Sequence, residues 1–166
     1  KTGTLTMDRV ILERHCDVDG VESERVLAHA YLISEFQTGL RNVLDDAILA
    51  HRGEHPTMAP DEWRKVDEIP FDFSRRVMSV VVEGRDGHRR LVAKGAPEAM
   101  LARCTHVERG GAVAPVAPDG HDAACAQYDT LSNDGFRVLA VAVRDVDVRA
   151  EYSRDDEQGL TLLGYT

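Results

Sequence analysis

Two short runs near the middle of the chain carry residue types that could hold a phosphorylated ligand. In the first, Lys94 ends an apolar run and is followed at once by Gly95. A lysine beside a residue without a side chain leaves an open cationic floor on which an anionic ligand can lie. In the second, Phe71 precedes Arg76 by five residues. A phenyl ring can stack on a base without base-specific contacts, and a guanidinium can bind phosphate.

Each run, taken alone, also has a plainer interpretation. Lys94 could be a solvated residue before a turn, and Phe71 could lie in the core, which is the commoner fate of a phenylalanine. Phe73 is a second candidate for that core position, and the two rings could alternate. The functional interpretation therefore depends on the other motifs of the chain.

The first seven residues are small and rich in hydroxyl groups, and they read Lys1-Thr2-Gly3-Thr4-Leu5-Thr6-Met7. This run resembles the phosphorylation motif of P-type cation-transporting ATPases, beginning at the second residue of that motif. In that family an aspartate precedes the lysine and accepts the γ-phosphoryl group of ATP, which divides one difficult step into two. The resemblance implies that the acceptor stands immediately before Lys1. It also implies that the hydroxyl groups and the lysine help to position phosphate and Mg²⁺.

The two central runs carry the same resemblance. Residues 94–98, Lys-Gly-Ala-Pro-Glu, are similar to the KGAPE motif of the family's nucleotide-binding domain. Residues 71–80 resemble the segment in which an aromatic ring stacks on adenine and a cation five residues later meets the nucleotide. The resemblance gives these roles to Phe71 and Arg76. Many members of the family have lysine where Arg76 stands, and arginine can also bind phosphate or stack through its plane.

Two further positions match binding residues of the family. Asp45 corresponds to an acidic residue that lies beside adenine, and Arg137 to an arginine that closes over the phosphates. Without the resemblance, Asp45 would be read as a solvated acid on a helix and Arg137 as a surface charge at the start of a strand. The resemblance thus implies a nucleotide site formed by Asp45, Phe71, Arg76, Lys94, Gly95 and Arg137, with adenine against the phenyl ring and the polyphosphate near the three cations.

Longer stretches distinguish subgroups of the family. Residues 17–27, 36–42 and 67–73 look most like bacterial magnesium-transporting P-type ATPases. Calcium, proton and sodium/potassium pumps share the shorter motifs but resemble these stretches less. We therefore expect the domain to serve a pump for Mg²⁺, with a calcium or other cation pump as the alternative.

The resemblance implies a division of the chain and a set of partners. Residues 1–7 would be a remnant of the phosphorylation domain and its hinge, and residues 8–166 the nucleotide-binding domain. The expected partners are ATP with Mg²⁺ and the phosphorylation, actuator and transmembrane domains of a parent protein in the inner or plasma membrane. The isolated chain, on the cytoplasmic side, is expected to be a monomer that binds nucleotide without hydrolysing it.

Other functional classes remain open. A stand-alone nucleotide-binding module would share the site but have no pump attached. A haloacid-dehalogenase-type phosphatase would share the aspartate motif, yet it would have no KGAPE-like segment, which this chain contains. A partner-docking role for an acidic surface would leave the chain without nucleotide affinity.

Composition and charge restrict these possibilities. The 166 residues suit one domain of ordinary size, and 43% hydrophobic residues are enough to build a core. The formal net charge of −9 argues against binding to nucleic acid or anionic lipid, which both require a basic surface. It does not exclude one anionic ligand held by a few local cations. No apolar run approaches the roughly 20 residues of a membrane span.

Metal and catalytic patterns are weak. The three cysteines are widely spaced, which argues against a zinc site or a disulfide framework and fits a reducing compartment. His51 and His55 have the spacing of a metal-binding pair on a helix, but Gly53 and Pro56 favour a loop. We see neither a Ser/His/Asp set nor a Walker-type glycine loop, and we expect no metal site formed by protein ligands.

Hydrophobic periodicity and turn residues predict the elements that would position the site. Ser23 is placed to cap a helix that buries Val26, Ala30 and Ile33. Gly84-Arg-Asp-Gly87 joins two β-branched runs and predicts a hairpin. The order of hairpins and helices favours an α+β fold, with an antiparallel β-sheet flanked by helices. Strands are expected at 10–12, 63–69, 78–82, 91–93, 137–143 and 160–164, further helices from 42, from 97 and at 121–133, and loops at 51–61 and 110–111.

Overall fold

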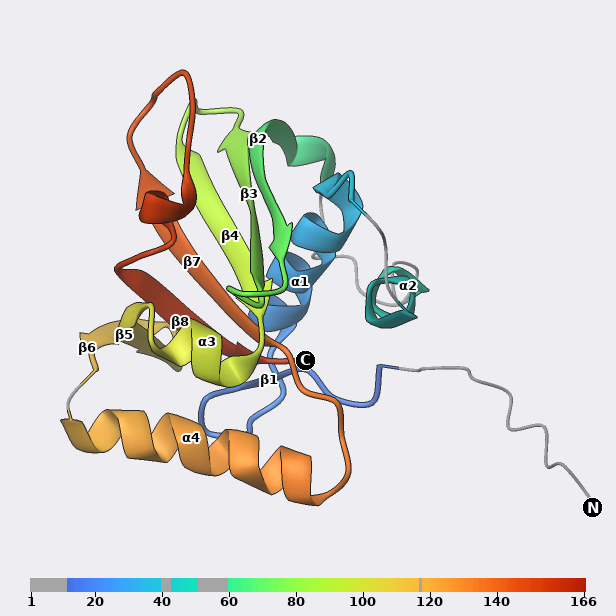
Figure 1. Ribbon diagram of the computed structural model, residues 1–166, viewed down its shortest axis with the longest axis vertical. Coiled ribbons are helices and arrows are strands. Elements are labelled where there is room, and N and C mark those ends of the chain that lie inside the picture. The colour runs from blue at the N-terminus through green and yellow to red at the C-terminus, as the bar shows by residue number, and fades with distance from the viewer. Residues whose placement is uncertain (1–11, 40–42, 51–59, 117) are drawn as a thin grey trace, which may run out of the picture.

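The computed structural model describes residues 12–39, 43–50, 60–116 and 118–166 (Figure 1). The hydroxyl-rich motif at 1–7, most of the strand predicted at 10–12 and the His51–His55 pair lie outside these residues. Leu12 is described and has no regular secondary structure. The boundary between residues 1–7 and 8–166 remains a prediction.

Among the described residues, eight strands form one sheet in the order β2-β3-β4-β7-β8-β5-β6, and β1 pairs with β8. These pairs are antiparallel, except that β5 runs parallel to β8. The α+β class predicted from the sequence, with a mainly antiparallel sheet, is therefore confirmed. The strands are β1 (Cys16–Asp17), β2 (Trp63–Asp72), β3 (Val77–Gly84), β4 (Arg89–Gly95), β5 (Cys104–Arg109), β6 (Ala112–Pro115), β7 (Ala140–Val146) and β8 (Leu160–Tyr165).

The helices begin where the sequence provides a start signal. The Ser23 hydroxyl accepts a hydrogen bond from the Val26 amide (3.4 Å) and caps the first helix, as predicted. Pro97 stands in the first turn of the third helix, where a missing N–H costs little. The helices are α1 (Glu24–Phe36), α2 (Val43–Ala50), α3 (Pro97–Leu101) and α4 (Pro118–Asn133), with 3₁₀ turns η2 (Pro60–Glu62) and η3 (Arg154–Asp156).

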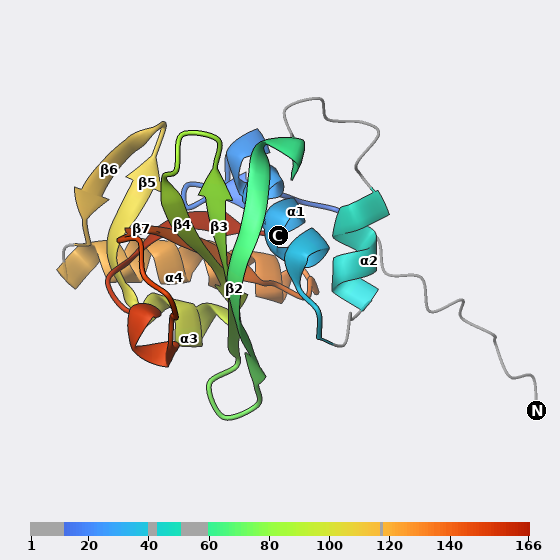
Figure 2. The same ribbon diagram turned by 90° about the horizontal axis from the view of Figure 1, so that it is seen from above.

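Helices cover both faces of the sheet (Figures 1 and 2). α1, with α2 beside it, packs on one face, and α3 and α4 lie on the other. Side chains of β3 alternate between the two cores: Val81 belongs to the α3–α4 side, while Val80 and Val82 face α1. Burial of each such valine stabilises the fold by about 1.5 to 3 kcal/mol. The same alternation decides which polar residues of β3 and β4 can meet α1 and α2.

Two strand predictions require correction. The strand predicted from residue 137 begins at Ala140, because β4 ends at Gly95, which pairs with Ala140 and leaves no partner strand before it. Leu139 instead exchanges two backbone hydrogen bonds with Thr166, at 2.8 and 2.9 Å. The turn at Gly110-Gly111 is confirmed, but it joins β5 and β6, a hairpin that sequence periodicity did not indicate. β6 is exposed along its whole length, so it has no apolar alternation to detect.

None of the helices among the described residues combines the length and the apolar character that a membrane crossing requires.

Candidate functional site

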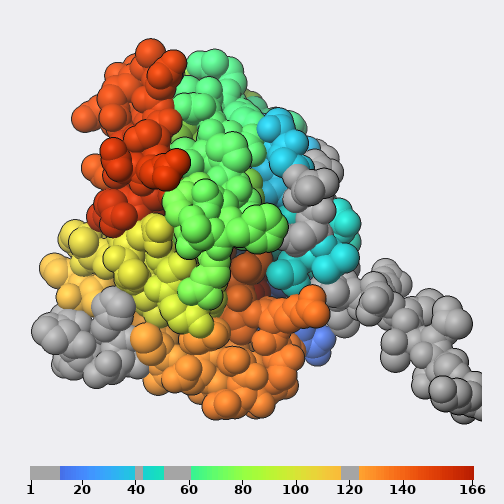
Figure 3. All heavy atoms as spheres, in the orientation of Figure 1, coloured from blue at the N-terminus to red at the C-terminus, as the bar shows by residue number. Residues whose placement is uncertain are grey.

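A pocket of about 440 Å³ opens at the end of β4, where α1, β2, β3 and the segment before β7 meet. This volume lies in the range of small-molecule sites. Green, cyan and orange segments surround the opening in the space-filling view (Figure 3). Its lining consists of Gln37, Gly39, Glu68, Pro70, Phe71, Phe73, Met78, Lys94, Gly95 and Leu139. Three of the six residues predicted for the site, Phe71, Lys94 and Gly95, therefore share one pocket.

Lys94 lies at the inner wall of this pocket and is 4% exposed. Strand alternation in β4 directs its side chain toward α1 and α2. The ammonium forms an ion pair with Asp45 of α2 and donates a hydrogen bond to the Ser34 hydroxyl of α1 (3.0 Å). Asp45 also accepts hydrogen bonds from Ser34 (2.9 Å) and from the Gln37 amide (2.7 Å). The structure thus brings Asp45 to Lys94, and two polar residues of α1 complete the cluster.

The charge of Lys94 is largely compensated inside the protein. Burial lowers the pKa of Lys94, and the ion pair with Asp45 raises it but does not fully offset the burial. A cation that is already paired attracts a polyphosphate less than a free one would. The arrangement suits recognition of a polar, uncharged group, such as the edge of a base, better than capture of phosphate.

Two phenyl rings form the rim of the pocket. Phe71 is 48% exposed and Phe73 is 90% exposed, so the core position considered for Phe73 is wrong. The ring centroids are 5.2 Å apart with an interplanar angle of 85°, an edge-to-face pair. The turn after β2 holds them outward, because the Asp72 carboxylate accepts hydrogen bonds from the backbone N–H groups of Ser74 (2.7 Å) and Arg75 (3.2 Å). Hydrogen bonds from Ser74 and Arg75 also hold the pKa of Asp72 below its usual value.

Arg76 lies beside the pocket and not among its lining residues. Its backbone has a φ of 55°, in the left-handed region that few non-glycine residues adopt. Its carbonyl accepts a hydrogen bond from the Ala96 amide (3.0 Å), and a Cβ built on Gly95 would lie 2.3 Å from that carbonyl oxygen. Glycine is therefore required at position 95 for β3 and β4 to approach. The Arg76 side chain is 55% exposed, with one carboxylate oxygen of Glu98 at 3.8 Å.

Glu68 provides a second polar wall. Its carboxylate accepts hydrogen bonds from the backbone N–H (3.0 Å) and the hydroxyl (2.8 Å) of Thr38, and it forms an ion pair with Lys65. Burial opposes the charged form, but the hydrogen bonds from Lys65 and Thr38 outweigh it and keep the pKa of Glu68 below its usual value. Glu68 thereby ties β2 to the end of α1, which fixes the width of the pocket.

Arg137 lies elsewhere. It is exposed and lines a second cavity of about 290 Å³, which is bordered mainly by apolar residues of α2, the end of α4 and the chain end at Tyr165. Leu139 lines both cavities, so Arg137 is two residues from the first pocket along the chain. A contact between Arg137 and a ligand in the first pocket remains a prediction.

Sequence reasoning missed polar residues around the pocket: Gln37 and Glu68 of its lining, and Ser34, which contacts Lys94. One signal was available for Ser34 and Gln37. Both fall on the apolar stripe of α1, four and seven residues after Ala30, where a polar side chain needs a buried partner. Among the described residues, no group of three or more His, Cys, Asp or Glu side chains is arranged to hold a metal ion.

Comparisons with known proteins identify the relatives of this sequence. Residues 48–166 match the family model described as P-type ATPase, cytoplasmic domain N. The chain is 45% identical to the magnesium-transporting ATPase, P-type 1, of Escherichia coli strain K12 over 99% of its length, and that alignment covers 19% of the relative. It is also 45% identical to a protein of the same description from Salmonella typhimurium strain LT2, with 18% of that relative covered. A calcium-transporting ATPase of Bacillus subtilis is 31% identical over 61% of this chain and 12% of its own length. The chain thus spans about a fifth of the length of the magnesium-transporting relatives.

Proposed function

Because this chain belongs to the P-type ATPase family as its cytoplasmic domain N, we propose that it binds ATP in the pocket rimmed by Phe71 and Phe73. The observation that carries the proposal is the placement of an exposed phenyl ring, a buried lysine and a bare glycine around one opening. Phe71 comes from β2, and Lys94 and Gly95 come from the end of β4, so two strands that are separated by β3 supply them.

Adenine is the part of ATP that this pocket suits. A base can enter with one face against the phenyl ring of Phe71, a contact worth about 1 to 3 kcal/mol. The paired ammonium of Lys94 and the amide of Gln37 lie at the inner wall, where they can meet the polar edge of the base. Asp45 then acts behind Lys94, because its carboxylate is buried and already bound by three side chains.

The phosphates would extend toward Arg76. The Arg76 guanidinium is exposed beside the pocket, so it can turn to a phosphate. Arg137 is the second cation assigned to the phosphates. We propose that Mg²⁺ arrives bound to the phosphates of ATP, as this ion commonly does in ATP-dependent enzymes.

In the proposed reaction, this domain positions ATP for transfer of its γ-phosphoryl group. This domain holds ATP, and closure onto a phosphorylation domain of the parent protein brings the γ-phosphate to an acceptor aspartate outside this chain. Most of the catalysis is then alignment and stabilisation of charge. The isolated chain would bind nucleotide weakly, because only part of the closed site is present, and would not hydrolyse it.

The parent protein is proposed to be an ATP-driven pump for a cation. The relatives named for magnesium transport match 99% of the chain at 45% identity, whereas the relative named for calcium transport matches 61% at 31%. This difference favours Mg²⁺ over Ca²⁺ as the transported ion. Transport of Mg²⁺ by cells that carry the full-length gene in a strain without its own magnesium pumps would test the assignment.

The nucleotide site can be tested with the chain alone. Titration with Mg·ATP is expected to shift backbone amide resonances near Phe71, Lys94 and Arg137. Phe71→Ala is expected to weaken binding by about 5- to 150-fold, the equivalent of one stacking contact. Phe136→Ala is the matched control, because Phe136 lines only the second cavity and should leave affinity unchanged. Shifts that leave Phe71 and Lys94 unaffected would show that ATP does not bind in this pocket.

A further inference from the structure

A buried carboxylate on the far face of the sheet is tied to the turn that carries the two aromatic rings. Glu157 belongs to residues 147–159, between β7 and β8, which we call the strap. Its side chain is fully buried, and its two oxygens have different partners. One accepts a hydrogen bond from the Ser79 hydroxyl of β3 (2.8 Å), and the other forms an ion pair with Arg75. Glu157 therefore joins the strap to both β3 and the β2–β3 turn.

Arg75 connects Glu157 to the segment that carries the two rings. Its second terminal nitrogen donates a hydrogen bond to the carbonyl of Pro70 (2.7 Å), the residue immediately before Phe71. Its backbone N–H donates to the Asp72 carboxylate (3.2 Å). Arg75 thus connects the end of the β2–β3 turn to Pro70, which precedes the turn in β2. Phe71 and Phe73 both lie in the segment between Pro70 and Arg75.

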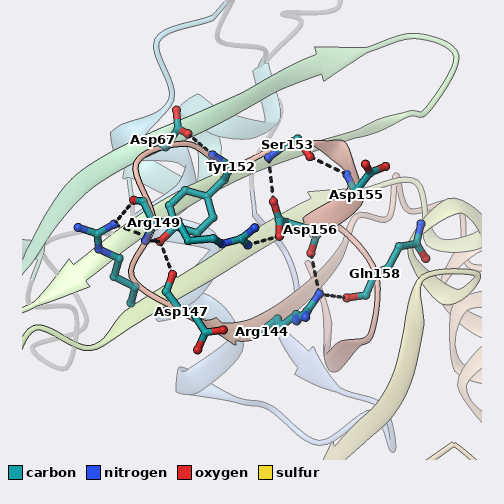
Figure 4. Close-up of polar contacts among 10 residues, drawn as sticks. Asp67, Arg144, Asp147, Arg149, Tyr152, Ser153, Asp155, Asp156 and Gln158 are labelled. Atoms are coloured by element: carbon teal, nitrogen blue, oxygen red, sulfur yellow. Dashed lines mark hydrogen bonds and ion pairs between the residues drawn. The ribbon is translucent and has the colours of Figure 1, made fainter.

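Hydrogen bonds and an ion pair hold the strap in place (Figure 4). The backbone N–H of Tyr152 donates to Asp67 of β2 (2.8 Å), and the Tyr152 hydroxyl donates to the carbonyl of Asp147 (2.6 Å). Asp156 forms an ion pair with Arg149 and closes a capping box with Ser153. These contacts hold the strap at several points along its length. Tyr152 thus ties the strap to β2, and the contacts of Asp156 brace the segment that carries Glu157.

Glu157 cannot reach a ligand in the pocket. Ser79, its partner in β3, points to the face that carries the α3–α4 core, and Tyr152 of the strap is part of that core. Lys94 and Met78 line the pocket from the opposite face. Any influence of Glu157 on the pocket must therefore pass through Arg75 and the turn.

We propose that Glu157 is a positioning residue for nucleotide binding, acting through Arg75 to hold Phe71 and Phe73 in a conformation ready to stack. The inference rests on the proposed function of the pocket. Exposed rings on an untied turn would sample many orientations, and binding would have to restrict them at a cost in affinity. The ion pair removes that cost in advance. Because it acts on the rings, it should affect every ligand that carries the base, whether or not phosphates are present.

The first test measures the affinity of the 166-residue chain for ATP and for adenosine. Glu157→Ala is expected to weaken both ligands by the same factor, about fivefold. Asp145→Ala is the matched control, because it breaks ion pairs with Arg90 and His88 that contact neither the strap nor the β2–β3 turn. It should leave both affinities unchanged. Loss confined to ATP, or an equal loss in the control, would overturn the proposal.

The second test is a double-mutant cycle. In a Phe71→Ala, Phe73→Ala background, Glu157→Ala should cost no further affinity, because there are no rings left to position. An undiminished fivefold loss in that background would contradict the proposed pathway. Arg75→Met with Glu157→Leu replaces the ion pair by apolar side chains and guards against loss of folding. It should weaken adenosine to the same extent, since the Pro70 carbonyl loses its donor, and wild-type affinity in this variant would also overturn the proposal. Failure of the wild-type chain to bind either ligand would instead refute the nucleotide site itself.

Discussion

The ammonium of Lys94, which lines the first pocket, and the carboxylate of Asp45 form a buried ion pair. The pair joins β4 to α2, and the hydroxyl of Ser34 lies between the two charges, donating to Asp45 (2.9 Å) and accepting from Lys94 (3.0 Å). Two charged residues with this degree of burial must satisfy each other, because solvent is not available to either. We therefore expect the pair to serve both the fold and the proposed binding surface.

Removing Lys94 should separate these two roles. Lys94→Met leaves Asp45 charged, buried and without its main partner, and we expect the free energy of unfolding to fall by about 3 to 5 kcal/mol. The double variant Lys94→Met, Asp45→Leu should recover most of this stability, since no buried charge remains, but it should not recover ATP affinity. Urea unfolding and nucleotide titration of both variants measure the two effects.

The exposed ion pair between Arg64 and Glu83 provides the control for that experiment. Arg64→Met should cost less than about 1 kcal/mol, because a solvated pair contributes little, and should not affect ATP binding. Wild-type affinity in the Lys94→Met, Asp45→Leu variant would mean that the pair serves the fold alone.

Phe73 is expected to contribute to nucleotide binding although sequence reasoning assigned the stacking role to Phe71. Its ring is almost fully exposed and meets Phe71 edge to face, so it can support that ring or cover the other side of a base. Phe73→Ala should weaken ATP binding by up to about tenfold and leave the unfolding free energy within about 0.5 kcal/mol of the wild type. A marked loss of stability, measured by urea unfolding, would indicate that Phe73 packs against the protein after all.

Gly95 and Gly39 both line the pocket, yet only one of them should resist substitution. A Cβ at position 95 would lie 2.3 Å from the Arg76 carbonyl oxygen, whereas a Cβ at position 39 meets nothing within 4 Å. Gly95→Ala should therefore push β3 and β4 apart and destabilise the chain by roughly 1 to 3 kcal/mol. Gly39→Ala should be nearly neutral. Thermal unfolding of the two variants makes the comparison, and equal melting temperatures would refute the argument.

Much of the fold could be predicted because local signals agreed with the final packing. Ser23 caps α1, Pro97 opens α3, and the turn at residues 84–87 joins β3 to β4 as their residue types indicated. The start of β7 could not be placed, because residues 137–139 look like a strand but lack a neighbouring strand with which to pair. Pairing is a property of the whole sheet and is not encoded in the segment itself.

The sequence predicts candidate site residues but not the contacts among them. Lys94 and Asp45 were both identified by resemblance, yet they are 49 residues apart, and only the packing of α2 beside β4 shows that they neutralise each other. Phe73 has the residue type of a core position. The backbone N–H groups of Ser74 and Arg75 donate hydrogen bonds to the Asp72 carboxylate, and this turn keeps Phe73 at the surface. Hydrophobic periodicity cannot predict such bonds, because they depend on the backbone geometry of the turn.

The buried histidine of α1 gives a prediction about acid stability that does not involve the pocket. The Nε2 atom of His29 has no hydrogen-bond partner among the described residues, while Nδ1 is 2.7 Å from the Arg25 carbonyl. Burial lowers the pKa of His29 to about 4, and the nearby Arg25 and Arg90 charges act in the same direction. The folded state thus favours neutral His29, and between pH 4 and 6.5 the unfolded chain binds more protons than the folded one.

The stability that depends on neutral His29 is therefore complete above pH 6.5 and is lost as the pH falls toward 4. Between pH 7.5 and 5 this residue alone should lower the free energy of unfolding by about 2 kcal/mol. His29→Leu should remove that part of the pH dependence, as measured by urea unfolding at the two pH values. Leu32→Ala, at an equally buried position of the same helix, should lower stability by a similar amount at both and keep the wild-type slope. A His29→Leu variant that loses stability between pH 7.5 and 5 as steeply as the wild type would show that other groups account for the acid sensitivity.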